Sequence, residues 1–198
     1  MRFVLLVAAG VTVVSVLSGV AAAGSPSAAA PAASAAAKHG DYLVQIMSCN
    51  DCHTPWVMGA QGPEPDLSRL LSGHPQSIAM PPAPDLSKGP WVWAGAGSMT
   101  AFAGPWGVSY AANLTPDKET GLGQWTEETF TQAMRTGRHE GRGRPILPPM
   151  PWFSVAKTTD EDLHAIFAYL QSIPAIRNQV PQPVEPVATA NPPAQGTR

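Results

Sequence analysis

The stretch Cys49-Asn50-Asp51-Cys52-His53 decides how the rest of this 198-residue chain is interpreted. Two thiols three positions apart on one helical turn can each add to one vinyl group of the same porphyrin, and the imidazole that follows then faces the iron. The spacing Cys-x-x-Cys-His is therefore typical of covalent attachment of a c-type haem. We predict that Cys49 and Cys52 bind one haem c covalently and that His53 is an axial ligand of its iron.

Three other uses of a cysteine pair explain this motif less well. A thioredoxin-like redox couple leaves His53 without a role and needs an alternation of strands and helices that the sequence does not show. A zinc ribbon needs a second pair of cysteines, and the chain has only two cysteines. A disulfide between Cys49 and Cys52 would close a very small loop and would stabilise the fold little.

Residues 1–23 have the pattern of a secretory signal peptide. Arg2 is followed by an apolar run from Phe3 to Val20, and three alanines precede an expected cleavage site at Gly24. An uncleaved membrane anchor is the alternative, because an apolar run of about 18 residues is long enough to span a bilayer, although polar residues and glycines dilute it. Both versions predict an exported, periplasmic protein, and the second predicts a membrane-anchored one.

Composition divides the remaining chain into three parts. Residues 24–37 contain almost only Ala, Pro and Ser and are expected to form a flexible linker, since they have no large apolar side chain to bury. Residues 181–198 are expected to form a Pro-rich disordered tail. The part between them, 38–180, is long enough for one domain. The formal net charge of −2 gives no basic excess, so we expect no nucleic-acid partner.

Three segments of this domain carry helical patterns, and no segment shows a sustained strand alternation. The first helix is expected from about His39 to Asn50, and the second starts at Thr126 and ends before Gly137. The third is expected over about 159–172, with Thr158-x-x-Glu161 as a capping box. We therefore predict an all-α fold with three main helices around one covalent haem and a long loop insertion rich in Pro, Gly and Trp.

The second iron ligand is expected to be Met150. Prolines 148, 149 and 151 fix the backbone on both sides of it, and a flexible thioether that bonds iron weakly needs such a rigid support. Trp152 and Phe153 follow and can shield the site from water. Met80 has similar proline neighbours and remains the alternative ligand.

These residues together resemble the class I c-type cytochromes, namely bacterial periplasmic mono-haem cytochromes and the haem domains of cytochrome subunits of membrane-bound dehydrogenases. The resemblance implies a cytochrome c-like fold, His53 and Met150 as axial ligands, and close packing of the first and last helices at Gly40, near Tyr169. It covers about 38–178. The matching stretches are 40–43, 49–55, 112–117, 120–126, 135–137, 148–152, 160–163 and 168–170.

The insertion, residues 56–112, is longer than small members of that class need. A loop of this length is usually functional or disordered, and its aromatic side chains argue for order. We expect it either to fold over a haem edge as a structural flap or to form a surface where a partner docks.

Basic and histidine side chains give two further expectations. One or two arginines of a basic cluster are expected to pair with the haem propionates, because buried anions need charge-assisted partners, and the others are expected to be solvated. Histidines outside the haem motif are expected at the surface rather than as second haem ligands. The basic cluster is Arg135, Arg138, His139, Arg142 and Arg144, and those histidines are His39, His74, His139 and His164.

The function predicted from these features is electron transfer by an electron carrier that is not itself an enzyme. Methionine ligation in an apolar pocket favours the ferrous state and leaves no position for a substrate. A haem that binds or senses a small ligand, a c-type peroxidase and an electron-relay subunit of a larger dehydrogenase are the alternatives. The expected partners are a redox protein donor and acceptor, with membrane association only through an uncleaved N-terminal segment or a partner complex.

Overall fold

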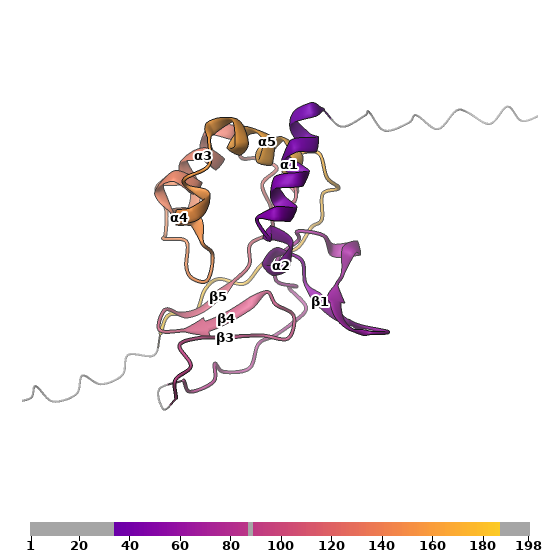
Figure 1. The fold of residues 1–198 in the computed structure, drawn as a ribbon. Coiled ribbons are helices and arrows are strands. Elements are labelled where there is room, and N and C mark those ends of the chain that lie inside the picture. Colours follow the sequence, from indigo (N-terminus) through magenta and orange to yellow (C-terminus); the bar gives the residue numbers. More distant parts are fainter. Residues whose placement is uncertain (1–33, 87–88, 187–198) are drawn as a thin grey trace, which may run out of the picture. The chain divides into compact units, whose positions relative to one another are not determined.

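The computed structural model describes residues 34–86 and 89–186 (Figure 1). The predicted signal, residues 1–23, lies outside the described residues, as do 24–33 of the predicted linker and 187–198 of the predicted tail. None of the helices in the two described ranges is both long and apolar enough to cross a bilayer. The domain boundaries predicted from composition therefore remain predictions.

The two helices farthest apart in the described chain pack side by side, α1 (Ala35–Ile46) and α5 (Asp160–Leu170) (Figure 1). The first begins after Ser34, whose hydroxyl accepts a hydrogen bond from the Ala37 amide, so it starts earlier than the predicted His39. A Cβ atom at Gly40 would overlap the Ala165 carbonyl and would lie 2.8 Å from Cβ of Tyr169. The absent side chain of Gly40 thus permits the close crossing that the resemblance implies.

Threonine caps begin both later long helices. In α3 (Glu127–Thr136) the Thr126 hydroxyl accepts a hydrogen bond from the Thr129 amide, and Gly137, at φ 64°, ends the helix in the left-handed region. These bounds confirm the predicted second helix. Helix α5 has a capping box, but its members are Thr159 and Asp162, one position after the predicted pair.

Shorter helical pieces connect these three. The predicted first helix breaks at Ser48, which has φ 58°, so that the cysteine motif forms a separate helix, α2 (Cys49–His53). A short helix α4 (Trp152–Val155) follows the predicted methionine ligand. Two 3₁₀ turns, η1 (Leu67–Arg69) and η2 (His139–Gly141), lie in the connecting loops.

The hydrophobic core lies among the helices. Phe130 of α3 packs against Phe167 of α5, with ring centroids 5.4 Å apart. Leu71 comes from the insertion and is fully buried in the same cluster, so the insertion contributes to the core. The buried members of the cluster are Leu43, Val44, Leu71, Leu122, Phe130, Val155, Leu163, Ala165, Ile166 and Leu170.

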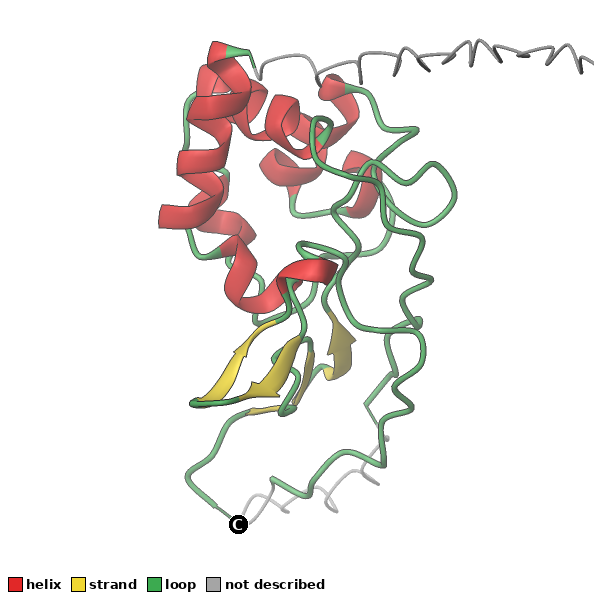
Figure 2. Cartoon of the chain, turned by 90° about the vertical axis from the view of Figure 1, so that its right-hand side faces the viewer, coloured by secondary structure: helices red, strands yellow, loops and turns green. Residues whose placement is uncertain are grey.

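The all-α prediction is wrong, because the insertion contains two small antiparallel sheets (Figure 2). The first sheet pairs β1 (Trp56–Gly59) with β2 (Gly62–Pro65). The second has the order β3-β4-β5, with β3 (Ala94–Gly95), β4 (Ala101–Gly104) and β5 (Gly107–Tyr110). In Figure 2 the helices lie together and the strands lie below them.

Short strands explain why the sequence pattern did not show these sheets. Strands of two to four residues are too short to establish an alternation, and Ala101, Phe102 and Ala103 are all buried in succession. The sequence feature that could have indicated these hairpins is the glycines at their turns. Gly59 pairs with Gly62 and Gly104 with Gly107, so each hairpin closes through a two-residue connection between glycines.

The surface position predicted for His74 is also wrong, because His74 is fully buried. Its Nε2 lies 3.1 Å from the Ile78 carbonyl, which fixes the proton there, and its Nδ1 lies 2.9 Å from the Thr100 hydroxyl. Burial lowers the pKa of His74. A neutral imidazole with both nitrogens hydrogen-bonded therefore connects the segment from His74 to Ile78 with Thr100, which directly precedes β4.

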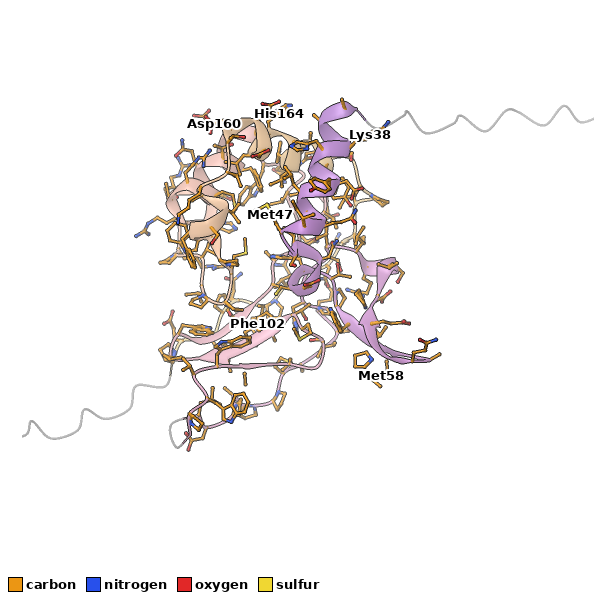
Figure 3. The ribbon with its side chains drawn as sticks, in the orientation of Figure 1. Lys38, Met47, Met58, Phe102, Asp160 and His164 are labelled. Carbon is orange, nitrogen blue, oxygen red and sulfur yellow. The ribbon has the colours of Figure 1, made fainter. Side chains whose placement is uncertain are left out.

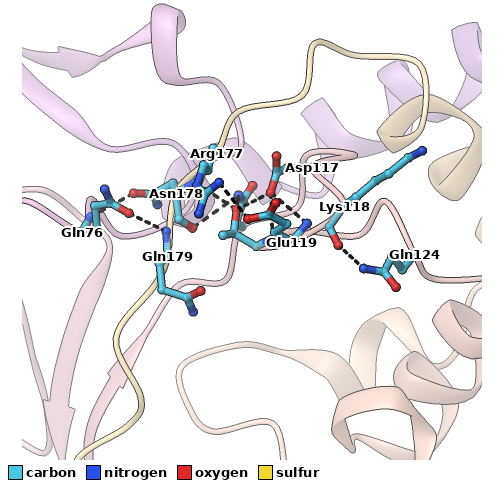
Figure 4. A network of polar contacts seen from close by, with 10 residues as sticks. Gln76, Asp117, Lys118, Glu119, Gln124, Arg177, Asn178 and Gln179 are labelled. Atoms are coloured by element: carbon cyan, nitrogen blue, oxygen red, sulfur yellow. Dashed lines mark hydrogen bonds and ion pairs between the residues drawn. The ribbon is translucent and has the colours of Figure 1, made fainter.

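The segment after α5 returns along the insertion and is held there by Asn178 (Figure 4). The fully buried side chain of Asn178 donates through Nδ2 to the carbonyls of Ser72 at 2.7 Å and His74 at 2.9 Å. Its Oδ1 accepts from Nη2 of Arg69 at 3.1 Å and from the Gln76 amide at 2.9 Å. One amide side chain thus satisfies four groups of the insertion.

Replacing Asn178 with alanine is expected to reduce the free energy of unfolding by about 2–4 kcal/mol, because buried donors and acceptors lose their partner. Urea unfolding followed by circular dichroism measures this loss. Gln179→Ala is the matched control, because Gln179 is exposed and bonds Gln76 through its backbone amide. Equal stabilities of the two variants would show that the Asn178 network does not hold the segment.

Candidate haem-binding site

The helix α2 carries both cysteines and the histidine of the predicted site. The left-handed backbone of Ser48 turns the chain after α1, and α2 then presents the half-buried thiols of Cys49 and Cys52. Both thiols are free. His53 ends the helix and is buried, with 8% of its surface exposed.

Two backbone contacts fix the position of His53. Its Nδ1 lies 2.8 Å from the carbonyl oxygen of Ala112, which can only accept a hydrogen bond, so the proton is on Nδ1. The carbonyl of His53 in turn accepts from the Gly73 amide at 2.8 Å. The lone pair of Nε2 is therefore available for a metal, in the tautomer that metal-bound histidines usually adopt.

The acid–base properties of the motif suit an iron-binding histidine and argue against a thioredoxin-type couple. Burial lowers the pKa of His53, which keeps the imidazole neutral as a metal ligand requires. Burial raises the pKa of the Cys49 thiol to about 11, and burial with the nearby Asp51 raises that of Cys52. Reactive redox thiols need a lowered pKa, so these cysteines are unlike those of a thioredoxin-type couple.

Met150 is the predicted methionine that reaches the same core as the cysteine motif. Met150 and Cys49 both pack, partly buried, against the hydrophobic cluster. Within the described residues, the alternative ligand Met80 is not among the side chains packed against that cluster. In Figure 3, Met47, which directly follows α1, lies beside the helices and packs partly buried against their core, whereas Met58 lies on the outer β1–β2 hairpin.

The loop that carries Met150 is held from both ends. The Ile146 amide donates to the Gly137 carbonyl at 2.8 Å, and a Cβ atom at Gly137 would overlap the Trp152 ring. After the loop, the Arg135 guanidinium donates to the Ala156 carbonyl and, at 2.8 Å, to that of Thr158. The end of α3 therefore fixes the segment before and after Met150.

Arg135 of the basic cluster supports this loop, whereas Arg138, Arg142 and Arg144 are exposed. Arg135 also pairs with Asp160 at 2.6 Å, so its guanidinium is committed to joining α3 and α5. Arg138 donates to the Gly143 carbonyl at 3.0 Å, and Arg144 donates to its neighbour's carbonyl at 3.3 Å. His139 packs edge-on against Trp125 at 5.2 Å between ring centroids. Pairing of an arginine with a haem propionate stays a prediction.

The residues around α2 fit a covalently attached haem. Two adjacent free thiols suit two thioether bonds, and the fixed imidazole of His53 suits an iron ligand. Several large apolar side chains beside the hydrophobic core cluster are only partly buried, although a closed core would bury them completely. They include Met47, Leu70, Leu114, Trp125, Met134 and Met150, which supply the apolar surroundings that such a group requires.

No family model matches the chain. Over 132 residues it is 29% identical to the cytochrome c subunit of the quinone alcohol dehydrogenase of Gluconobacter oxydans, covering 67% of this chain and 20% of the relative. Over 154 residues it is 29% identical to the gluconate 2-dehydrogenase cytochrome c subunit of Pantoea cypripedii, and the match covers 78% of this chain and 24% of that relative. Over 89 residues it is 34% identical to the fructose dehydrogenase cytochrome subunit of Gluconobacter japonicus, and the match covers 42% of this chain and 18% of that relative.

All three of these relatives are named cytochrome subunits of dehydrogenases. The similarity confirms the predicted resemblance to cytochrome subunits and the predicted class of function, electron transfer by a cytochrome c. The chain spans less than a quarter of the length of each of these relatives. Similarity over so small a part does not extend the activities of the whole relatives to this chain.

Sequence reasoning missed the groups of the insertion that contact the site. Ala112 lies in a stretch that carried the resemblance, but its carbonyl is a backbone group and left no signal in the residue type. Ser109 has its hydroxyl 2.6 Å from the Pro148 carbonyl, and a serine in a Gly-rich stretch is too common to indicate such a contact. Neither contact was predicted.

Proposed function

We propose that this chain carries one covalent haem c and passes single electrons between redox proteins outside the cytoplasm. The observation that carries the proposal is the arrangement of α2, where two free thiols precede an imidazole whose Nδ1 is bonded to the Ala112 carbonyl. When bound, the haem supplies an iron that cycles between the ferric and ferrous states.

Each residue of the site has a distinct role in this proposal. Cys49 and Cys52 would hold the porphyrin through thioether bonds, and Nε2 of His53 would bind the iron. Met150 would supply the second iron ligand, a role supported by the anchoring of its loop at Gly137 and Trp152 and by the packing of its side chain against the shared core. A thioether ligand and apolar surroundings stabilise the ferrous iron and raise the potential.

Electron transfer fits these residues better than ligand sensing or peroxidase chemistry. Sensing requires an open or labile sixth position, and the anchored loop of Met150 supports a filled one. A c-type peroxidase usually needs a second haem, whereas this sequence contains two cysteines and one attachment motif. The chain therefore acts as a carrier and does not convert a substrate itself.

We extend the proposal to an electron-relay subunit of a dehydrogenase. The relatives over the longest matches are named as cytochrome c parts of alcohol and gluconate dehydrogenases, and this role assigns the electron donor to a catalytic partner protein. The export signal predicted for residues 1–23 supports a periplasmic location for the haem domain. Membrane association would come through that segment if it is retained, or through the partner complex.

Covalent attachment is tested by haem staining after denaturing electrophoresis of the exported protein made in a host that matures c-type cytochromes. The wild-type chain should retain the stain, and a pyridine haemochrome measurement should give one haem per chain. The double variant Cys49→Ala/Cys52→Ala should lose the stain. A wild-type chain without stain would contradict covalent attachment.

The relay role is tested by purifying an affinity-tagged form of the full chain from the organism that makes it. A catalytic dehydrogenase subunit should copurify, and adding that enzyme's substrate should reduce the haem. A chain that purifies alone and is reduced by small soluble redox proteins would instead be a free shuttle.

A further inference from the structure

One short segment of the insertion contacts both sides of the proposed haem site. Ser109, in β5, is buried, and its Oγ donates to the Pro148 carbonyl at 2.6 Å, two positions before Met150. Ala112, three positions after Ser109, accepts the hydrogen bond from Nδ1 of His53 at 2.8 Å. Residues 109–112 thus reach the elements of both predicted axial ligands.

The direction of the Ser109 hydroxyl is set by its surroundings. Nε1 of Trp106 donates to Ser109 Oγ at 3.2 Å, which occupies an acceptor site of the hydroxyl and leaves its proton to be donated. The Phe102 carbonyl is 3.5 Å away, whereas the Pro148 carbonyl is 2.6 Å away. The hydrogen bonds therefore run from Trp106 through Ser109 to Pro148, an arrangement that strengthens each bond.

The methionine loop has few other means of holding its own backbone. Prolines 148, 149 and 151 have no N–H group, so they cannot donate to the rest of the domain. Among the described residues, the backbone hydrogen bonds of this loop are that of the Ile146 amide to Gly137, before the prolines, and those of the Trp152 amide to Met150 and of the Ser154 and Val155 amides to Pro151, which form the turn into α4. Within the described part of the chain, the Ser109 hydroxyl donates the hydrogen bond that the Pro148 carbonyl accepts from outside the loop.

We propose that Ser109 is a positioning residue for the Met150 ligand and that the insertion is a support for both axial ligands. This inference rests on the proposed ligation by Met150. Under this inference the insertion positions His53 and Met150, which its length and composition alone did not indicate. Ser109 acts through the Pro148 carbonyl and does not touch the iron.

Removing the Ser109 hydroxyl should affect the loop more than the hairpin. The backbone of β5 is held separately, because Val108 exchanges two hydrogen bonds with Val184, at 2.8 and 2.9 Å. The Ala111 amide also donates to the Thr100 carbonyl at 2.8 Å. The strand therefore keeps its place without the hydroxyl, while the Pro148 carbonyl loses its partner.

The test is Ser109→Ala in the full, haem-loaded chain, measured by carbon monoxide affinity of the ferrous protein. A loosened methionine should be displaced more readily, so we expect affinity to rise roughly three- to tenfold. The weak sulfur-to-ferric-iron charge-transfer band should weaken in parallel. Ser109→Thr keeps the hydroxyl and should restore both readouts.

Ser72→Ala is the matched control. Ser72 is a fully buried serine of the same insertion, and its Oγ has no hydrogen-bond partner within the described residues. This variant should leave carbon monoxide affinity and the band unchanged. If Ser109→Ala fails to fold, Trp106→Phe decides the question, because it removes the donor behind Ser109 and should raise the affinity by a smaller factor.

Wild-type carbon monoxide affinity and an unchanged band in Ser109→Ala would overturn the inference. Equal effects of Ser109→Ala and Ser72→Ala would also overturn it, because the hydroxyl would then matter only as part of the fold. A wild-type protein without the charge-transfer band would reject the Met150 ligation and with it this role. The proposed function and the role of Ser109 therefore fail in distinguishable ways.

Discussion

Replacing Met150 with alanine is expected to lower the midpoint potential of the haem by on the order of 0.1 V, within the roughly 0.8 V range that axial ligands cover. The thioether stabilises ferrous iron, and water or hydroxide in its place favours the ferric state. The sixth position should then be open to carbon monoxide. A redox titration followed by absorbance measures the first effect, and a carbon monoxide titration of the reduced protein measures the second.

Two other methionines make this prediction specific. Met58→Ala is the matched control, because Met58 is 78% exposed on the outer hairpin and should not affect the potential. Met80→Ala tests the alternative ligand. If Met80→Ala lowers the potential and Met150→Ala does not, the ligand assignment is wrong and the loop after α3 has another role.

Replacing Gly40 with alanine is expected to cost about 3–5 kcal/mol of the free energy of unfolding. An added Cβ would overlap the Ala165 carbonyl and press on Tyr169, so α1 and α5 could no longer cross at their present distance. At a helix position free of such contacts, the same change would stabilise by up to about 1 kcal/mol. Steric contact and helix propensity therefore predict opposite signs at this position.

The Gly40 prediction is measured by thermal and urea unfolding of the haem-loaded protein. Gly97→Ala is the control, because a Cβ atom there meets nothing within 4 Å. A Gly40→Ala variant as stable as wild type would show that α1 and α5 cross less closely than in this structure. Because α1 leads directly into α2, an increased distance between α1 and α5 should also displace α2 and weaken haem binding.

The elements that carry strong local signals were predictable from the sequence. Thr126, Glu127 and Gly137 bound a helix that the structure shows at the expected place. The spacing of Cys49, Cys52 and His53 predicts a haem attachment site, and the structure has all three on one short helix. Such features depend on residues close together in the chain, which is why one sequence sufficed to find them.

The insertion was not predictable in the same way, because its order comes from contacts between distant residues. Its strands are too short for an alternating pattern, and its fixed position depends on Asn178, which lies about a hundred positions beyond the carbonyls it bonds. His74 was placed at the surface because a histidine alone gives no sign of the partners that Ile78 and Thr100 provide. The break at Ser48 likewise needs a left-handed backbone that serine rarely adopts.

The optical spectrum of the exported protein, oxidised, reduced and reduced with carbon monoxide, tests the central claim most directly. Ligation by His53 and Met150 predicts a low-spin spectrum with the weak red-end sulfur-to-iron band in the oxidised form. Because the methionine competes for the iron, it also predicts no shift at the low carbon monoxide concentrations that saturate an open haem. A high-spin spectrum, or ready binding of carbon monoxide, would contradict that ligation and would favour a haem that binds small ligands.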